Sequence, residues 1–127
     1  VHGEFAGIKP TYQMVTAVHL YHIFLQPEKS ISLPAQGMAF AYGLNGNGTT
    51  AGEKIQAQTL INYSTTGDTV TITAGSEGLE CMFATGTPHQ EPITYGGPFV
   101  MTTQEQMNET RRRYLNGEMG KLDPFVE

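Results

Sequence analysis

The sequence predicts a mainly β fold, a jelly-roll β-barrel of about eight or more antiparallel strands with one C-terminal helix. The chain of 127 residues contains 15 glycines and 7 prolines, a composition that favours short strands joined by tight turns. Runs rich in β-branched and aromatic residues recur along it, and good helical spacing occurs only after residue 100. This length predicts one domain over residues 1–127, with strands at about 1–101, a helix at about 103–116 and a tail at 117–127.

The first third of the chain is expected to form strands. Val1–Gly7 is typical of a short β-like lead, and Met14–Leu25 is the longest apolar run. The Val, Ile, Phe and Tyr content of that run predicts a strand buried on both faces. Ser30–Leu33 alternates polar and apolar residues and predicts a short strand that ends at Pro34. Gly37–Leu44 predicts the next strand.

Glycine and asparagine mark the expected turns in the middle of the chain. Asn45-Gly46-Asn47-Gly48 predicts a hairpin turn, because Asn-Gly is the strongest short hairpin signal. It is no phosphate-binding loop, since no Lys follows and no helical pattern opens there. Ile55–Tyr63 predicts a strand in one piece or two. Asp68–Thr73 predicts a half-exposed strand, Ala74–Gly78 a turn, and Leu79–Ala84 a strand returning antiparallel to it.

The terminal helix has recognisable ends. Thr102 is the expected N-cap, with Glu105 completing a capping box, and Asn116-Gly117 supplies a left-handed stop. The predicted inward-facing stripe consists of Met107, Thr110, Tyr114 and Leu115. Before the helix, Pro92–Pro98 predicts an edge strand or irregular backbone, because Pro98 donates no ladder hydrogen bond.

Charge and cysteine content exclude some classes of function. Seven Lys and Arg against twelve Asp and Glu give a net charge of −5, which argues against a direct nucleic-acid surface. Arg111, Arg112 and Arg113 spread around the helix instead of forming one patch. Nothing resembles a signal peptide or a transmembrane run, and Cys81 has no disulfide partner in the chain. We therefore expect a cytoplasmic protein that does not contact membranes and keeps Cys81 as a buried thiol.

The segment around the helix resembles a known family. Glu91-Pro92, the run Tyr95-Gly96-Gly97-Pro98-Phe99-Val100-Met101 and the closing Asn116-Gly117 look like the C-terminal signature of the pirins, which are two-domain cupins. Thr102 stands where the family commonly has Asn, and Gly97 is an additional glycine. The resemblance continues more weakly through Leu33-Pro34, Gly43–Gly48 and Gly67-Asp68, so it covers nearly the whole chain. It implies a cupin-like jelly-roll barrel, in agreement with the strand pattern.

The histidines are the first candidates for a metal site. They are His2, His19, His22 and His89. His19 and His22 are three residues apart in a predicted strand, so their side chains point to opposite faces unless a bulge intervenes. The resemblance implies that iron ligands would fall in Leu33–Gly48 and Gly67–Gly86, and neither region contains a histidine. Because pirins carry iron in the N-terminal domain, the resemblance implies no metal, cofactor-binding or catalytic residue in this chain.

Other groups have ordinary explanations. Asp68, Glu77 and Glu80 fall in or beside predicted turns, where carboxylates usually face water. Cys81 as a nucleophile would need His19 or His22 as a base, and a packed thiol is commoner. The aromatic residues of the strands could line a pocket, although such residues mostly form core: Tyr12, Tyr21, Phe40, Tyr42, Tyr63 and Phe83.

The sequence and the resemblance thus predict a metal-free C-terminal cupin domain with a structural and interaction role, and they leave open whether the chain is itself an enzyme. The parent protein would resemble an iron-binding, redox-linked regulator or a quercetinase-like dioxygenase. Alternatives are a stand-alone small-molecule-binding cupin and a metal-dependent enzyme that uses the barrel cavity. The expected partner is an N-terminal cupin domain or a second copy, met through Phe99, Val100 and Met101, unless these residues seal the end of the barrel.

Overall fold

The computed structural model describes Gly7 and residues 15–122, and the chain forms two compact units, Val1–Pro88 and His89–Glu127. The β-like lead predicted at Val1–Gly7 lies, apart from Gly7, outside the described residues, as do His2 and Tyr12. Each unit has its own core and is described separately. No helix among the described residues is long and apolar enough to cross a membrane.

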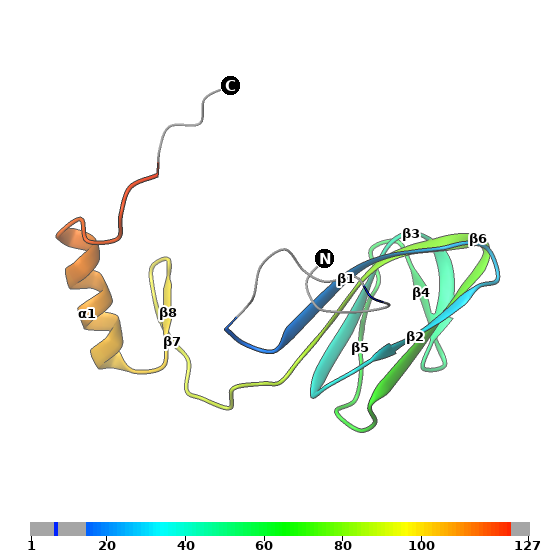
Figure 1. Cartoon of the computed structure of the whole chain (residues 1–127), viewed down its shortest axis with the longest axis horizontal. Coiled ribbons are helices and arrows are strands. Elements are labelled where there is room, and N and C mark those ends of the chain that lie inside the picture. The colour runs from blue at the N-terminus through cyan, green and yellow to red at the C-terminus, as the bar shows by residue number, and fades with distance from the viewer. Residues whose placement is uncertain (1–6, 8–14, 123–127) are drawn as a thin grey trace. The chain divides into compact units, whose positions relative to one another are not determined.

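Six strands of the first unit form one antiparallel sheet (Figure 1). The longest strand, β6, pairs along one edge with β3 and along the other with β2 and then β1, while β4 and β5 pair with β3. The predicted mainly β fold class is confirmed, and the strand pairings among the described residues form an open, curved sheet. The bounds are β1 (Val18–Leu25), β2 (Ser30–Pro34), β3 (Met38–Thr50), β4 (Glu53–Gln56), β5 (Leu60–Asn62) and β6 (Thr69–Gly86).

One face of this sheet holds the core. Residues without exposed surface come from four of its strands: Leu33, Ala41, Ile55, Ile72, Cys81 and Phe83. In β1, Tyr21 and Ile23 are buried, whereas Leu20, His22 and Phe24 are exposed. The prediction that both faces of this strand are buried is therefore wrong, because the described residues pack on its inner face only.

The strand β3 does not turn at Asn45–Gly48, as the sequence predicted. It continues to Thr50, and the reversal is made by Ala51 and Gly52, whose φ angles are +51° and +82°. The glycines serve register shifts in the pairing with β6. At Gly46, φ is +72° and a Cβ atom would lie 2.2 Å from the carbonyl oxygen of Gly78, so glycine is required there.

The turn predicted at Ala74–Gly78 is also absent, and β6 keeps its direction. Gly46 pairs with Leu79 and Gly48 with Ala74, so residues 75–78 stand opposite Asn47 alone. The glycine-rich segment is thus a bulge, and Leu79–Ala84 continues the strand instead of returning beside it. By contrast, the strand predicted at Ile55–Tyr63 in one piece or two occurs as β4 and β5.

The second unit is a hairpin packed on a helix, formed by β7 (Thr94–Gly96), β8 (Phe99–Met101) and α1 (Gln104–Leu115). Gly97 and Pro98 form the two-residue turn between the strands. Gly97 has a φ angle of +61°, a conformation that favours glycine, and this explains why a glycine stands at this position. Since β7 pairs with β8 alone among the described strands, the predicted edge position is confirmed.

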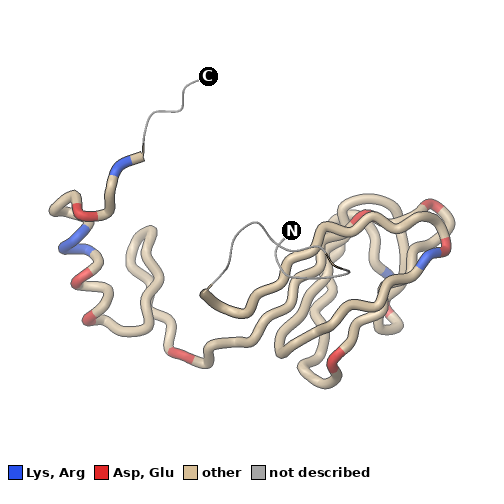
Figure 2. The backbone as a smooth tube through the Cα atoms, in the orientation of Figure 1, with Lys and Arg blue, Asp and Glu red and all other residues tan. Residues whose placement is uncertain are grey.

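The helix packs through few side chains. Met107 is fully buried, the hydroxyl of Thr110 lies 3.6 Å from the sulfur of Met101, and the rings of Phe99 and Tyr114 meet edge to face at 5.5 Å. Tyr114 and Leu115 are otherwise mostly exposed, so the predicted stripe is correct only in its first half. Figure 2 shows charged residues along the same helix.

The capping box is displaced by one residue from the prediction. The N-cap is Thr103, whose hydroxyl oxygen accepts a hydrogen bond from the amide of Gln106, and the Gln106 side chain accepts from the amide of Thr103. Thr102 instead donates from its hydroxyl to the same Gln106 oxygen at 2.7 Å. At the other end, Gly117 has φ +71°, and the amide of Glu118 bonds the carbonyl of Arg113. The predicted left-handed stop is confirmed as a Schellman motif.

Candidate functional site

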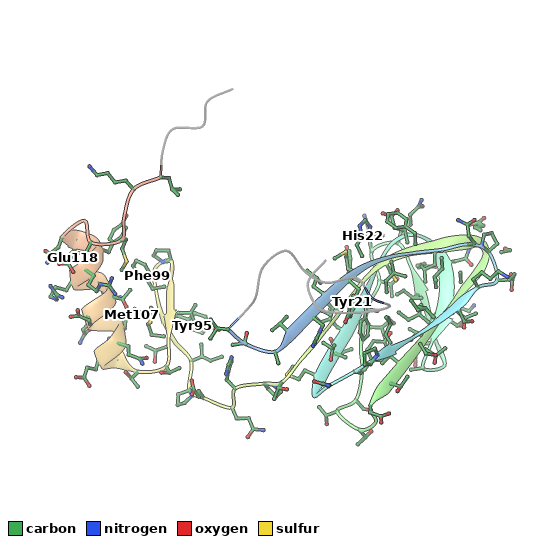
Figure 3. The ribbon with its side chains drawn as sticks, in the orientation of Figure 1. Tyr21, His22, Tyr95, Phe99, Met107 and Glu118 are labelled. Atoms are coloured by element: carbon green, nitrogen blue, oxygen red, sulfur yellow. The ribbon has the colours of Figure 1, made fainter. Side chains whose placement is uncertain are left out.

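The two described histidines of the first unit lie on opposite faces of one strand. On β1, His19 shares the inner face with Tyr21, whose hydroxyl lies 3.3 Å from its Nδ1 atom. His22 lies on the outer face, where its Nε2 atom is 2.9 Å from Oε1 of Glu80 and its ring stands over Phe24 (Figure 3). His89 belongs to the second unit. The opposite orientation of His19 and His22 is confirmed.

The inner face is mainly apolar in the regions where a cupin metal would need donor atoms. In the regions corresponding to the cupin ligand positions, the buried inward side chains are those of Leu33, Ala35, Ala39, Ala41, Val70, Ile72, Ala74, Leu79, Cys81, Phe83 and Thr85, and the Thr85 hydroxyl is hydrogen-bonded to the backbone of Gln36. No group of three or more His, Cys, Asp or Glu among the described residues is placed to hold a metal ion. An iron ion takes imidazole and carboxylate ligands, so these residues do not fit it.

Cys81 is buried in the inner face, and its cross-strand neighbour on β1 is Ile23. Burial, with a smaller contribution from the nearby Glu80 charge, raises the pKa of the Cys81 thiol to about 11. Since the thiolate is the nucleophilic form, this environment makes the residue inert at neutral pH. The interpretation as a packed thiol agrees with its position.

Two of the three carboxylates lie within a strand. Asp68 precedes β6, but Glu77 and Glu80 belong to it, so their predicted placement in or beside turns is wrong. Glu77 accepts a hydrogen bond from Nδ2 of Asn47 at 3.1 Å. The contact of Glu80 with His22 joins residues 58 positions apart, and sequence reasoning missed it because it depends on the register of β1 against β6.

The aromatic side chains divide between the two faces. Two tyrosine rings contact Phe83 on the inner face: Tyr21 is stacked on it at a centroid distance of 6.3 Å, and Tyr63 is tilted against it at 6.0 Å. The Tyr63 hydroxyl lies 2.8 Å from that of Thr50, and burial raises the pKa of Tyr63. Phe40 and Tyr42 lie on the outer face instead, so the prediction that strand aromatics form core is correct for only part of the set.

A cavity of about 370 Å³ opens beside Tyr63 in the first unit. Its walls include Ala35, Ile61 and Val70, together with the polar residues Glu53 and Thr71. The volume falls in the range of small-molecule pockets, and the wall is mixed in character. This cavity is the feature that a ligand-binding alternative would use.

Two of the three arginines of α1 are engaged locally. Arg112 makes two hydrogen bonds to the carboxylate of Glu109 and a longer contact with Glu118, and Arg113 also approaches Glu118. The hydrogen bond from Arg112 lowers the pKa of Glu109. These ion pairs are exposed to solvent, so each contributes little to the stability of the helix.

Comparison with known proteins gives one family. The family model described as the pirin C-terminal cupin domain matches residues 20–120. Among curated proteins of Arabidopsis thaliana, a putative pirin-like protein is 29% identical over 93% of this chain and 46% of its own length. A pirin-like protein is 32% identical over 93% of this chain and 41% of its own length. The chain thus spans less than half the length of these relatives.

Solved structures show the same fold. A crystal structure of quercetin 2,3-dioxygenase from Acinetobacter baumannii superposes with a TM-score of 0.78, at 23% identity, over 95% of this chain and 43% of that one. A second crystal structure of quercetin 2,3-dioxygenase from the same organism gives a TM-score of 0.74 at 18% identity, over 98% and 43%. At these identities the likeness concerns the fold.

Proposed function

Because this chain belongs to the pirin family as its C-terminal cupin domain, we propose that it is the structural and interaction half of a two-domain protein, without a metal of its own. The observation that carries the proposal is the placement of the imidazoles. His19 and His22 lie on opposite faces of β1, so the two cannot hold one ion together. The inner face that would surround a cupin metal is lined mainly by alkyl and aromatic groups, beside the thiol of Cys81, the hydroxyl of Thr85 and the imidazole of His19.

The remaining half of the parent protein then carries the chemistry. The relatives are more than twice as long as the matched segment, which leaves room for a second cupin domain before this one. We propose that the parent is an iron-binding, redox-linked regulator or a quercetinase-like dioxygenase, and the fold shared with quercetin 2,3-dioxygenase supports the second of these. A buried free thiol at Cys81 suits a reducing, cytoplasmic location.

Metal analysis tests this division of roles. The full-length protein and this chain are purified in parallel and analysed for iron, nickel, copper and zinc. We expect about one metal ion per full-length molecule and none that copurifies stoichiometrically with this chain. The variants His19→Ala and His22→Ala of the full-length protein should keep their metal. One equivalent of metal in this chain that either substitution removes would overturn the proposal.

The cavity beside Tyr63 favours one alternative, a small-molecule-binding domain. Its volume of about 370 Å³ and its mixture of apolar and hydroxyl groups suit a ligand of modest size. A thermal-shift screen with flavonols and other planar phenols tests it. Under the alternative, a hit raises the midpoint of the wild-type chain, and Ala35→Leu, which narrows the cavity, abolishes the shift.

A further inference from the structure

The cavity beside Tyr63 opens at one end of the sheet. Its walls come from the β3–β4 turn, the start of β6 and the loop between β5 and β6, which lies at the lower end of the sheet in Figure 1. Ala35, Ile61 and Val70 supply its apolar surface. A cavity of about 370 Å³ with such a wall is large enough for a small organic molecule. Its polar groups then decide which kind of molecule fits.

Glu53 is the charged group of this wall. Alternation along β4 places it on the same face as Ile55, which has no exposed surface, and the carboxylate stays open to solvent. Among the described residues, Glu53 forms no hydrogen bond or ion pair, and no Lys, Arg or His lines the cavity. Lys54 alternates to the opposite face and lines a different cleft. The described wall therefore carries a negative charge that no positive group balances.

Two hydroxyl groups of the wall have already donated their hydrogens. Thr50, which is 2% exposed, donates its single hydroxyl hydrogen to the carbonyl oxygen of Thr71 at 3.0 Å. The 2.8 Å hydrogen bond between Thr50 and Tyr63 is therefore donated by the Tyr63 hydroxyl, whose oxygen can only accept a further hydrogen bond. Thr69 likewise donates to Asp68, whose carboxylate adds a second negative charge beside the wall.

We propose that this cavity binds a small organic cation, an amine whose ammonium group pairs with the Glu53 carboxylate and whose hydrocarbon part packs on Ile61 and Val70. An ammonium group donates hydrogen bonds and accepts none, which suits a wall that offers a carboxylate and a phenol oxygen. The Tyr63 ring adds an aromatic face that attracts a cation. An anionic ligand would be repelled by the carboxylate. This site goes beyond the proposed structural role and gives the small-molecule alternative a specific ligand class.

The cleft beside Glu28 provides a matched control. It also contains one carboxylate, but Lys54 lies in the same wall, together with the amide side chains of Asn47 and Gln56. The lysine offsets the charge of Glu28 and repels a second cation. An amine should therefore distinguish these two openings of the same unit.

Three probes of similar shape and different charge test the ligand class: phenethylamine, phenethyl alcohol and phenylpropionate. Each is titrated into this chain, and the backbone amide shifts are followed by NMR. We expect the amine to bind at least about tenfold more tightly than the alcohol, as one charge-assisted hydrogen bond allows, and the carboxylate not to bind. The perturbed amides should be those of Ile61, Tyr63 and Val70, and not those of Asn47 and Thr73 in the other cleft.

Substitutions supply the second measurement. Glu53→Gln removes the charge and keeps the shape of the side chain, so the amine should lose its advantage over the alcohol. Glu28→Gln should bind the amine as the wild type does. Both positions are exposed, so both variants should unfold at the wild-type temperature. Added salt should weaken binding of the amine and leave binding of the alcohol unchanged.

Each other outcome rejects a separate statement. Equal binding of the amine and the alcohol would overturn the cation class and leave a cavity for neutral molecules. An amine that binds Glu53→Gln as tightly as the wild type, or that perturbs the cleft beside Glu28, would overturn the proposed site. Absence of binding by every probe would reject the site and its ligand class together. The structural role would stand in each case, because metal analysis of the full-length protein tests it separately.

Discussion

The pKa of the Cys81 thiol is determined by the residues packed around it. It lies in the fully buried layer with Leu33, Ile72 and Phe83, and its pKa rises to about 11 because burial disfavours the thiolate. The apolar run around the cysteine is enough to predict its burial. The magnitude of the effect depends on neighbours that only the sheet brings together.

This environment predicts a pH dependence of stability. In the unfolded chain the thiol ionises near its ordinary pKa of 9.0, whereas in the folded chain it stays protonated to about 11. The free energy of unfolding should therefore be unaffected by Cys81 below pH 9 and fall as pH rises toward 11. Urea unfolding of wild type and Cys81→Ala at pH 8 and pH 10 checks this. An equal pH dependence in both proteins would contradict it.

Single-residue chemistry is predictable where it follows from local alternation and not where it depends on register. The opposite faces of His19 and His22 follow from the two-residue period of a strand. The contact between His22 and Glu80 does not, since the pairing of β1 with β6 decides which carboxylate stands beside which imidazole. The turn predicted at Ala74–Gly78 also misplaces Glu80, which lies just beyond it in the same strand.

At the scale of elements, glycine is the source of the wrong predictions. Asn45–Gly48 and Ala74–Gly78 have turn composition, yet both segments are bulges within long strands, and the bulged residues face each other across the β3–β6 pair. The existence of strands in this part of the chain is predicted correctly, because apolar alternation determines it. The direction of the chain after each glycine-rich segment is not predicted correctly, because turns and bulges are rich in the same residue types.

The β3–β6 bulge predicts an unequal effect of two similar substitutions. Gly46→Ala places a Cβ 2.2 Å from the carbonyl oxygen of Gly78, so backbone must move, and we expect a loss of about 2 kcal/mol or more. Gly52 also has a positive φ angle, but a Cβ atom there would have no other atom within 4 Å. Gly52→Ala should therefore lower the free energy of unfolding by only about 1 kcal/mol. Chemical denaturation of both variants compares them. Equal losses would mean that the close approach is unimportant.

The displaced capping box makes a second prediction at this scale. Thr103→Ala removes the acceptor for the Gln106 amide and should destabilise the helix by about 1 kcal/mol. Thr102→Ala removes only an exposed hydrogen bond to the Gln106 side chain and should cost less than half as much. Hydrogen exchange of the first-turn amides of α1 measures both. A larger effect at Thr102 would restore the N-cap that the sequence predicted.

At the scale of the whole molecule, the two units differ in how much they bury. The first unit surrounds a core drawn from all its long strands, whereas the only fully buried hydrophobic residue described in the second is Met107. A hairpin and one helix form a marginal core. The family resemblance predicts the overall fold, but no sequence pattern indicates this contrast.

The contrast predicts two levels of protection against hydrogen exchange. Amides of β6, bonded to neighbours along both edges, should exchange at least about a hundredfold more slowly than those of α1. Mass spectrometry after deuterium labelling measures the ratio in this chain. A variant ending at Pro88 should keep the protection of β6. Loss of that protection on truncation would show that the first unit depends on the second.

The central position of β6 also constrains the order in which the chain can fold during synthesis. Val18 pairs with Gly86 and Ser30 with Thr73, so β1 and β2 pair with no described strand except β6, the last strand of the sheet in sequence. The β3–β4 hairpin can close as soon as it leaves the ribosome, but β1 and β2 must wait until β6 has emerged. Throughout that interval their apolar residues are unpaired, which makes nascent chains that stall before β6 the natural targets of chaperones.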